Sequence, residues 1–330
     1  MSDRATRQAF LQLIERPRVP LAPSVEAQPS PGPGLESERF TFAAEAGERV
    51  SGLLIRQSGG SEPRPALVVA HGTGGSKEAV LPLLCLAAAR GFTAVAIDAR
   101  HHGERAGRPE PGATVYLEAI FEKFRTGRGF PFLYDTVWDL MRLFDLLERR
   151  PEVDPARVAL LGISKGGMET YLTAAADPRW AVAIPVLGAQ SYGYGLAHDA
   201  WRSRVETIQG AFAAAAREAG VAQPDAAFVR HFYDRVVPGI YSDFDGPRML
   251  PLIAPRPLLV INGELDVRTP GLDLCQRETE AAYARAGAPG ALQFLVQSGV
   301  GHEFAPAATG LAFAWLERWL RPAHVHPSRR

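Results

Sequence analysis

The chain has 330 residues, of which 46% are hydrophobic and 22% charged, a composition typical of globular proteins rather than of disordered or fibrous ones. Lysine plus arginine number 36 and aspartate plus glutamate also number 36, so the formal net charge is zero. A neutral chain has no long-range field that attracts nucleic acid phosphates or an anionic membrane, so the composition argues against nucleic-acid binding. We expect one large domain that carries an insertion, because single cores stop growing at about 250 to 300 residues.

The cysteines and the apolar segments bear on the cellular compartment. Cys85 and Cys275 can form at most one bridge, too few for a secreted disulfide framework, and we expect two buried thiols. The start MSDRATRQAF contains no apolar run of signal-peptide length, and no window approaches the ~18 apolar residues of a transmembrane helix. We therefore expect a cytoplasmic protein without membrane insertion. The sequence leaves the oligomeric state open, with a homo-oligomer among the alternatives.

The first 37 residues are expected to form an arm, which is solvated, and a proline-rich linker. Apolar residues recur at helical spacing between positions 2 and 16. Prolines at 17, 20, 23, 29, 31 and 33 follow, and they predict that no regular element forms there. From 39 to 57, apolar and polar residues alternate across a glycine-containing turn, which predicts a β-hairpin.

Short, nearly continuous apolar runs then predict strands buried on both faces, as in a parallel sheet. The runs are 66–70, 92–97, 158–163, 181–187 and 257–261, and the predicted helices are 81–90, 134–149, 165–176 and 310–320. Strand alternating with helix indicates an α/β fold. We predict a core made of 38–188 and 251–322, a helical cap or lid over 189–250, and a tail over 323–330. Within the cap, helices are expected at about 196–219 and 225–237.

The strongest functional signal is the GxSxG motif GISKG at 162–166. It lies between the predicted strand 158–163 and the predicted helix 165–176. This is the context of a nucleophile elbow, in which small residues flank a serine on a strained strand-to-helix turn. We therefore predict that Ser164 is a nucleophile, the alternative being a serine that only caps the helix.

A serine hydroxyl is a weak nucleophile and needs a base, whose tautomer a third group fixes. Asp266 follows the run 257–261, and His302 follows the run LQFLV. The order Ser164, Asp266, His302, each just past a strand, is that of the α/β-hydrolase triad. Glu264 is the competing acid, but Asp266, three residues past the turn glycine, is better placed to reach across. The other seven histidines lie in the tail, in the cap or before Ser164.

An oxyanion needs two preset backbone donors. We predict the N–H of Lys165 and the N–H of Thr73, which belongs to the loop HGTGG at 71–75. That loop does not match the phosphate-binding pattern GxxxxGK[ST]. The Lys165 side chain is expected either to reach solvent or to meet an anionic substrate group.

Two further polar segments are assigned supporting roles. His71 is expected to shape the loop 71–75, and residues 98–103 are expected to order loops around the site rather than to act in catalysis. The sequence shows no metal-ligand set and no cofactor fingerprint, so we expect neither a metal nor a cofactor.

At these residues the chain resembles the α/β-hydrolase superfamily, in the branch of dienelactone hydrolases, acetyl xylan esterases and prolyl oligopeptidase-like proteins. The resemblance rests on the phrases HGTGGSKE, DARHHGER, VDPARVALLGISKGG, LIAPRPLLVINGELDVRTP and GVGHEF, and it spans about residues 40 to 320. It implies a mostly parallel sheet of about eight strands flanked by helices, a lid in 189–250 and acyl-serine chemistry. Dienelactone hydrolases proper carry cysteine where this chain has Ser164, which favours an ordinary ester.

The predicted function is hydrolysis of a small or medium carboxylic ester through an acyl-enzyme on Ser164. Three alternatives stay open. An acyl-CoA thioesterase is suggested by Lys165 and by GISKGG, which resembles thioesterases of the bile-acid acyltransferase type. A peptidase or a hydrolase of carbon–carbon bonds would use the same fold, and a binding protein without activity would keep the fold alone. The cap aromatics Tyr192, Tyr194 and Trp201 are candidates for the substrate pocket.

Overall fold

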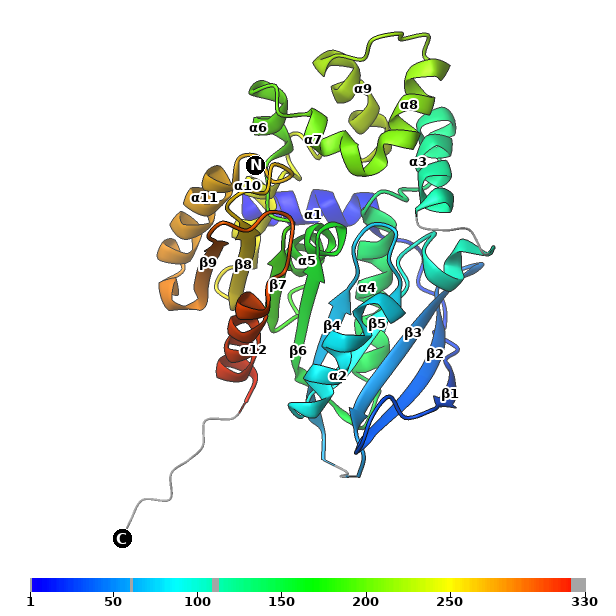
Figure 1. Cartoon of the computed structure of the whole chain (residues 1–330), viewed down its shortest axis with the longest axis vertical. Helices are drawn as coiled ribbons and strands as arrows, with labels where there is room; N and C mark the ends of the chain where they lie inside the picture. Colours follow the sequence, from blue (N-terminus) through cyan, green and yellow to red (C-terminus); the bar gives the residue numbers. More distant parts are fainter. Residues whose placement is uncertain (1, 60–61, 109–112, 322–330) are drawn as a thin grey trace.

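One sheet organises the part of the chain that the computed structural model describes, residues 2–59, 62–108 and 113–321 (Figure 1). Across these residues nine strands lie in the order β1-β2-β3-β5-β4-β6-β7-β8-β9. The pairs β1–β2, β2–β3 and β3–β5 are antiparallel, and all the others are parallel. The strands are β1 (Ser24–Gln28), β2 (Leu35–Glu45), β3 (Glu48–Gln57), β4 (Arg64–Ala70), β5 (Thr93–Ile97), β6 (Val153–Ile163), β7 (Val182–Val186), β8 (Leu258–Gly263) and β9 (Leu292–Gln297). The predicted mostly parallel α/β sheet is confirmed, and β1 adds a strand at its edge.

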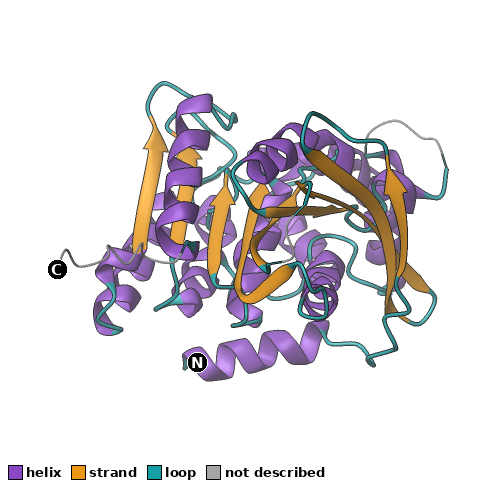
Figure 2. Ribbon diagram, turned by 90° about the horizontal axis from the view of Figure 1, so that it is seen from below, coloured by secondary structure: helices purple, strands orange, loops and turns teal. Residues whose placement is uncertain are grey.

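Helices cover both faces of the sheet (Figure 2). Helices α2 and α12 pack on one face, and α1, α4, α5 and α11 lie on the other, each layer closing its own apolar cluster. These helices are α1 (Asp3–Ile14), α2 (Leu81–Ala89), α4 (Tyr134–Leu147), α5 (Lys165–Ala176), α11 (Leu272–Arg285) and α12 (Pro306–Leu320). Short 3-10 turns are η1 (Lys77–Val80), η2 (Gly103–Ala106), η3 (Glu206–Ile208), η4 (Leu250–Ile253) and η5 (Pro289–Ala291). The two layers bury both faces of the parallel strands, as their unbroken apolar sequences predict.

The N-terminal arm is part of the folded core, so the expectation that it is solvated is wrong. The side chains of Phe10 and Ile14 are fully buried, and the Phe10 ring meets those of Tyr134 and Phe244. The expectation that the prolines exclude regular structure is also wrong, because β1 pairs with β2 between Pro23 and Pro29. An edge strand tolerates flanking prolines, since one side of its backbone has no partner strand.

A group of helices lies above the carboxyl ends of the parallel strands (Figure 1). Between β7 and β8 it contains α6 (Tyr192–Ala197), α7 (Arg202–Val205), α8 (Gln209–Glu218), α9 (Ala226–Val236) and α10 (Gly246–Met249), and α3 (Thr114–Thr126) packs beside α8 and α9. The helix predicted at 225–237 is α9. The one predicted at 196–219 is broken into pieces: Asp199, with a left-handed φ of 55°, lies between α6 and α7, and the 3-10 turn η3 lies between α7 and α8. The boundaries of the cap stay a prediction, and the tail 323–330 lies outside the described residues.

The buried position of Phe10 generates a first prediction. Replacing it with alanine leaves a cavity between α1, Tyr134 and Phe244, so we expect the free energy of unfolding to fall by about 3–5 kcal/mol. The matched control is Gln12→Ala, because Gln12 is exposed on the same helix, and its effect should stay within about 0.5 kcal/mol. Urea denaturation followed by circular dichroism measures both. Equal, small effects of the two changes would mean that α1 does not dock in solution.

Candidate active site

Ser164 lies on a sharp turn between β6 and α5. Its backbone has φ of 58° and ψ of −114°, a conformation that costs a non-glycine residue about 1–3 kcal/mol and that clusters at functional sites. Two neighbouring glycines make the turn possible. A Cβ on Gly162 would lie 2.1 Å from the Gly166 carbonyl oxygen, and one on Gly166 would lie 2.3 Å from that of Ala70. The turn is the predicted nucleophile elbow, and it directs the Ser164 hydroxyl away from the strand.

His302 and Asp266 meet Ser164 in a continuous hydrogen-bonded chain. The Asp266 Oδ2 atom is 2.7 Å from His302 Nδ1, and His302 Nε2 is 2.8 Å from Ser164 Oγ. An ionised carboxylate can only accept, so Nδ1 carries the hydrogen and Nε2 is left to accept from the Ser164 hydroxyl. The structure therefore brings together the three residues that the sequence predicts, in the geometry of a nucleophile, a base and an orienting acid.

The surroundings of Asp266 keep its carboxylate ionised, so that it accepts a hydrogen bond from His302. Its side chain is 1% exposed. Burial opposes its ionisation, but the hydrogen bonds from His302 and from the Arg268 N–H outweigh burial and lower the pKa of Asp266 below its usual value. Glu264, the competing acid in the sequence, is exposed and accepts instead from Ser298 Oγ and the Gly299 N–H. The preference for Asp266 over Glu264 agrees with this geometry.

The loop that carries His302 is clamped to the end of β9. The buried amide of Gln297 donates to the Glu303 carbonyl at 2.9 Å and accepts from the Ala305 N–H at 3.0 Å. The loop that follows β8 and carries Asp266, the acid loop, approaches the His302 loop closely. A Cβ on Gly263 would lie 2.0 Å from the Gly301 carbonyl oxygen. These contacts fix the separation of Asp266 and His302.

The loop after β4 lies against the nucleophile, where the sequence predicts an oxyanion donor. A Cβ on Gly72 would be 3.6 Å from the Ser164 Cβ. His71 holds this loop: Nδ1 donates to the Gly72 carbonyl at 2.8 Å and Nε2 accepts from the Ala99 N–H at 3.0 Å. Burial, helped by the charge of Lys165, lowers the pKa of His71 to about 3, so the ring is neutral. The assignment of the Thr73 and Lys165 amides as oxyanion donors stays a prediction.

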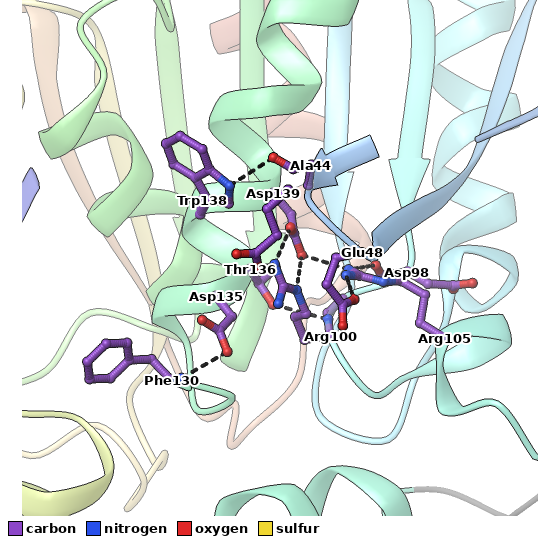
Figure 3. Close-up of polar contacts among 12 residues, drawn as sticks. Ala44, Glu48, Asp98, Arg100, Arg105, Phe130, Asp135, Thr136, Trp138 and Asp139 are labelled. Carbon is purple, nitrogen blue, oxygen red and sulfur yellow. Dashed lines mark hydrogen bonds and ion pairs between the residues drawn. The ribbon is translucent and has the colours of Figure 1, made fainter. Parts of the chain in front are cut away.

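The segment 98–105 after β5 is held by buried charges that connect it to the rest of the core. Asp98 accepts from the Lys77 N–H, the Lys77 ammonium and the Glu104 N–H at 2.9, 2.7 and 3.0 Å. Arg100 and Arg105 both bind Asp139 of α4, Arg100 through two nitrogens (Figure 3). Although burial opposes ionisation of Asp139, the two arginines lower its pKa. The predicted role of residues 98–103 in ordering loops around the site agrees with the contact of the Ala99 N–H with His71.

The Lys165 side chain does not reach solvent, so that expectation is wrong, and its contact with an anionic substrate group stays a prediction. It is 1% exposed, and its Nζ lies 2.5 Å from Glu169 Oε1, one helical turn along α5. The Tyr116 ring centroid is 5.6 Å from the same nitrogen. Burial raises the pKa of Glu169 above its usual value despite the lysine charge. The i,i+4 spacing of the two residues is a sequence signal for this pair.

The three pocket candidates lie in different environments. The Tyr192 side chain is buried, and its hydroxyl is 3.3 Å from Met168 Sδ, one helical turn beyond Ser164. Trp201 is also buried, and the Arg202 guanidinium lies over its ring. Tyr194 is 37% exposed and stacks on His198. Only Tyr192 among them contacts a residue next to the elbow, and the pocket role of all three stays a prediction.

The loop after β7, which the sequence analysis left unassigned, is organised by a buried acid. Asp245 accepts from Ser191 Oγ and from the backbone N–H groups of Tyr192, Gly193 and Gly246, at 2.6 to 3.0 Å. In the sequence Asp245 lies in a polar stretch without periodicity, so no pattern identifies it.

Three further observations concern the cysteines, possible metal ligands and the length of the helices. Cys275 is buried and Cys85 is half-buried, and both are free thiols, so only one of the two expected buried thiols is confirmed. Within residues 2–59, 62–108 and 113–321, no group of three or more His, Cys, Asp or Glu side chains could hold a metal ion. None of the helices described is long and apolar enough to cross a membrane.

Comparison with known proteins places the chain in a family. The family model for fungal glucuronyl esterase matches residues 55–287. The chain belongs to the glucuronyl esterase family. Two proteins of Bacillus subtilis (strain 168) are similar to this family member: YtaP, described as a hydrolase, is 26% identical over 232 residues, and YitV, described as an esterase, is 25% identical over 149 residues. The first match covers 70% of this chain and 66% of YtaP, and the second covers 44% and 54%. The matches thus span less than two thirds of each relative.

Solved structures show the same fold. The acetyl xylan esterase from Paenibacillus sp. R4 has a TM-score of 0.70 at 22% identity, covering 96% of this chain and 94% of that one. A glucuronoyl esterase from Solibacter usitatus has a TM-score of 0.62 at 17% identity, covering 94% and 91%. The family member described here therefore has the α/β-hydrolase fold that its sequence predicts.

The buried pair Lys165–Glu169 generates a prediction about stability. Lys165→Met leaves the Glu169 carboxylate without its cation, so we expect a loss of about 3–5 kcal/mol in the free energy of unfolding near neutral pH. Without the lysine charge the pKa of Glu169 rises further in the folded state. The folded variant then binds a proton that the unfolded chain releases above pH ~4.3, so its stability falls as pH rises. The measurement is urea denaturation at several pH values.

The control for this experiment is the double variant Lys165→Met/Glu169→Gln, which carries no titrating group at the site. Its stability should depend less on pH than that of Lys165→Met. A single variant as stable as the wild type at all pH values would show that the pair is not buried in solution.

The hydrogen bond between Asp266 and His302 generates a prediction about activity. Asp266→Asn presents an amide to His302 and favours the wrong imidazole tautomer, so kcat should fall by about 10⁴ while the fold is retained. Glu264→Gln is the matched control, because Glu264 lies two residues away and outside the hydrogen-bonded chain, and its kcat should stay within about threefold of wild type. Similar losses in both variants would contradict the assignment of Asp266.

Proposed function

We propose that this chain is a serine esterase that hydrolyses carboxylic esters of small to medium size through an acyl-enzyme on Ser164. The observation that carries the proposal is the hydrogen-bonded chain Asp266–His302–Ser164, with contacts of 2.7 and 2.8 Å. Membership of the glucuronyl esterase family supports ester hydrolysis as the reaction class.

The geometry supports the following steps. The Ser164 Oγ attacks the ester carbonyl carbon while its proton moves to His302 Nε2. The carbonyl π electrons move to the oxygen, which the N–H groups of Lys165 and Thr73 stabilise. The tetrahedral intermediate then expels the alcohol oxygen, which takes the proton from His302. A water molecule repeats the sequence on the acyl-enzyme and releases the acid and free Ser164.

Asp266 supports this cycle without changing its own protonation. Each time His302 takes a proton it becomes a cation, and the ionised carboxylate 2.7 Å from Nδ1 stabilises that cation. The lowered pKa of Asp266 keeps the carboxylate ionised through the range in which imidazole can act as a base.

No contact in the described part of the structure favours the thioesterase alternative. The sequence suggests it through Lys165, as a partner for a phosphate of coenzyme A, and through the resemblance of GISKGG to thioesterases. The Lys165 ammonium is buried against Glu169. No contact among the described residues distinguishes a peptidase or a hydrolase of carbon–carbon bonds from an esterase.

The test compares wild type and Ser164→Ala on p-nitrophenyl esters from acetyl to decanoyl, with acetyl-CoA, a longer acyl-CoA and the methyl ester of glucuronic acid alongside. We expect the wild type to cleave the simple esters and Ser164→Ala to lose at least about 10⁴ in kcat. Ser298→Ala, an exposed serine near the acid loop, should retain activity. Full activity in Ser164→Ala, or cleavage of the thioesters alone, would overturn the proposal.

A further inference from the structure

Arg204 of α7 is a buried cation that the catalytic steps above do not use. Its side chain lies among Tyr192, Tyr233 and Gln190 in the helices above the sheet, and the residue is 8% exposed. The Tyr233 hydroxyl donates to the Arg204 carbonyl at 2.7 Å, which fixes the backbone. The side chain is therefore held in place from both ends.

The guanidinium of Arg204 has more N–H donors than the described residues around it supply acceptors. Of its five N–H groups, one on Nη1 meets the Gln190 side-chain oxygen and one on Nη2 meets the Ser203 carbonyl. The buried Nε has no partner among the described residues. Burial of an unpaired cation is costly, and it lowers the pKa of Arg204.

Comparison with the other buried arginines shows that Arg204 is unusual. Arg100 and Arg142 are also less than a tenth exposed. Arg100 binds the Asp139 carboxylate and Arg142 binds that of Asp145. Among the residues that the structure describes, no carboxylate forms an ion pair with Arg204, so no ion pair offsets the cost of burying its charge.

Two intervening residues connect this cation to the Ser164 turn. Gln190, which contacts Arg204, donates to Met168 Sδ at 2.8 Å, and the Met168 N–H donates to the Ser164 carbonyl at 3.1 Å. On the other side, the Arg204 charge is one of the influences that lower the pKa of Asp266. A short series of contacts thus joins Arg204 to the elbow.

We propose that Arg204 is a specificity-determining residue that binds a free carboxylate on the acyl group of the substrate. The inference rests on the proposed esterase function. The leaving alcohol must lie against His302, which protonates it and whose side chain is 21% exposed. On this proposal the acyl group, which stays on Ser164, extends away from His302 toward the buried Arg204. A guanidinium fork matches a carboxylate in shape and charge.

The experiment compares esters that differ only in a terminal carboxylate. The monomethyl esters of succinic, glutaric and adipic acids are paired with methyl butyrate, pentanoate and hexanoate, and methanol release gives kcat/KM. A second arm places the charge on the alcohol, with 4-carboxybenzyl butyrate against benzyl butyrate. We expect the wild type to prefer at least one monomethyl ester over its neutral partner by about tenfold or more, and to show no such preference in the alcohol arm.

Variants then test whether Arg204 is the source of the preference. Arg204→Met should lower the ratio of charged to neutral kcat/KM by about tenfold or more, and Arg204→Lys should restore part of it. Arg202→Met is the matched control, because Arg202 lies two residues away with its side chain 70% exposed, and its ratio should equal that of the wild type. The ratio reports recognition separately from any loss of folded protein.

Three outcomes would overturn the inference: equal rates on charged and neutral acyl groups in the wild type, an equal loss on both in Arg204→Met, or a preference confined to the alcohol arm. If the wild type cleaves no ester in either arm, the esterase proposal fails and this inference fails with it. Cleavage of the neutral esters without a charge preference rejects only the role of Arg204.

Discussion

Close backbone packing around one strained residue decides the architecture of the site. Ser164 can hold its positive φ only because β6, α5 and the loop after β4 approach more closely than side chains would allow. Gly162 and Gly166 remove the Cβ atoms that would collide with carbonyl oxygens. The surrounding parallel strands supply the rigidity that offsets the strain, because they are buried on both faces and packed to near-crystalline density. The other two members of the hydrogen-bonded chain, Asp266 and His302, are then placed by the loops that follow β8 and β9.

Those loops are held by buried polar contacts rather than by apolar packing. The neutral His71 joins the loop after β4 to the segment 98–105 after β5. That segment is held in turn by the pair Asp98–Lys77 and by Asp139, which binds Arg100 and Arg105. Each such network is rigid only while every member is present, because a buried charge left alone is costly. The apolar layers therefore stabilise the sheet, and the buried charges determine the shape of the loops around Ser164.

The sequence predicts the strands, the elbow and the triad because each has a local pattern: an apolar run, a GxSxG turn, or a polar residue just past a strand. It does not predict β1, since the prolines around Ser24–Gln28 hide an edge strand whose pairing depends on a distant partner. The burial of the Lys165 and Arg204 side chains is missed for a related reason, because charged residues are usually exposed. The i,i+4 spacing indicates that Lys165 pairs with Glu169, but only the tertiary fold shows that this pair is buried and that Arg204 is buried among the helices above the sheet.

The helices above the sheet are tied to the acid loop by specific contacts. Arg268, two residues after Asp266, binds Glu206 at 3.0 Å, and the Ser191 N–H donates to the Pro270 carbonyl at 2.8 Å. The helices between β7 and β8 and the loop that carries Asp266 are thus one mechanical unit. A graft that replaces these helices with those of a relative has to carry the loop with it, because both contacts would otherwise be lost.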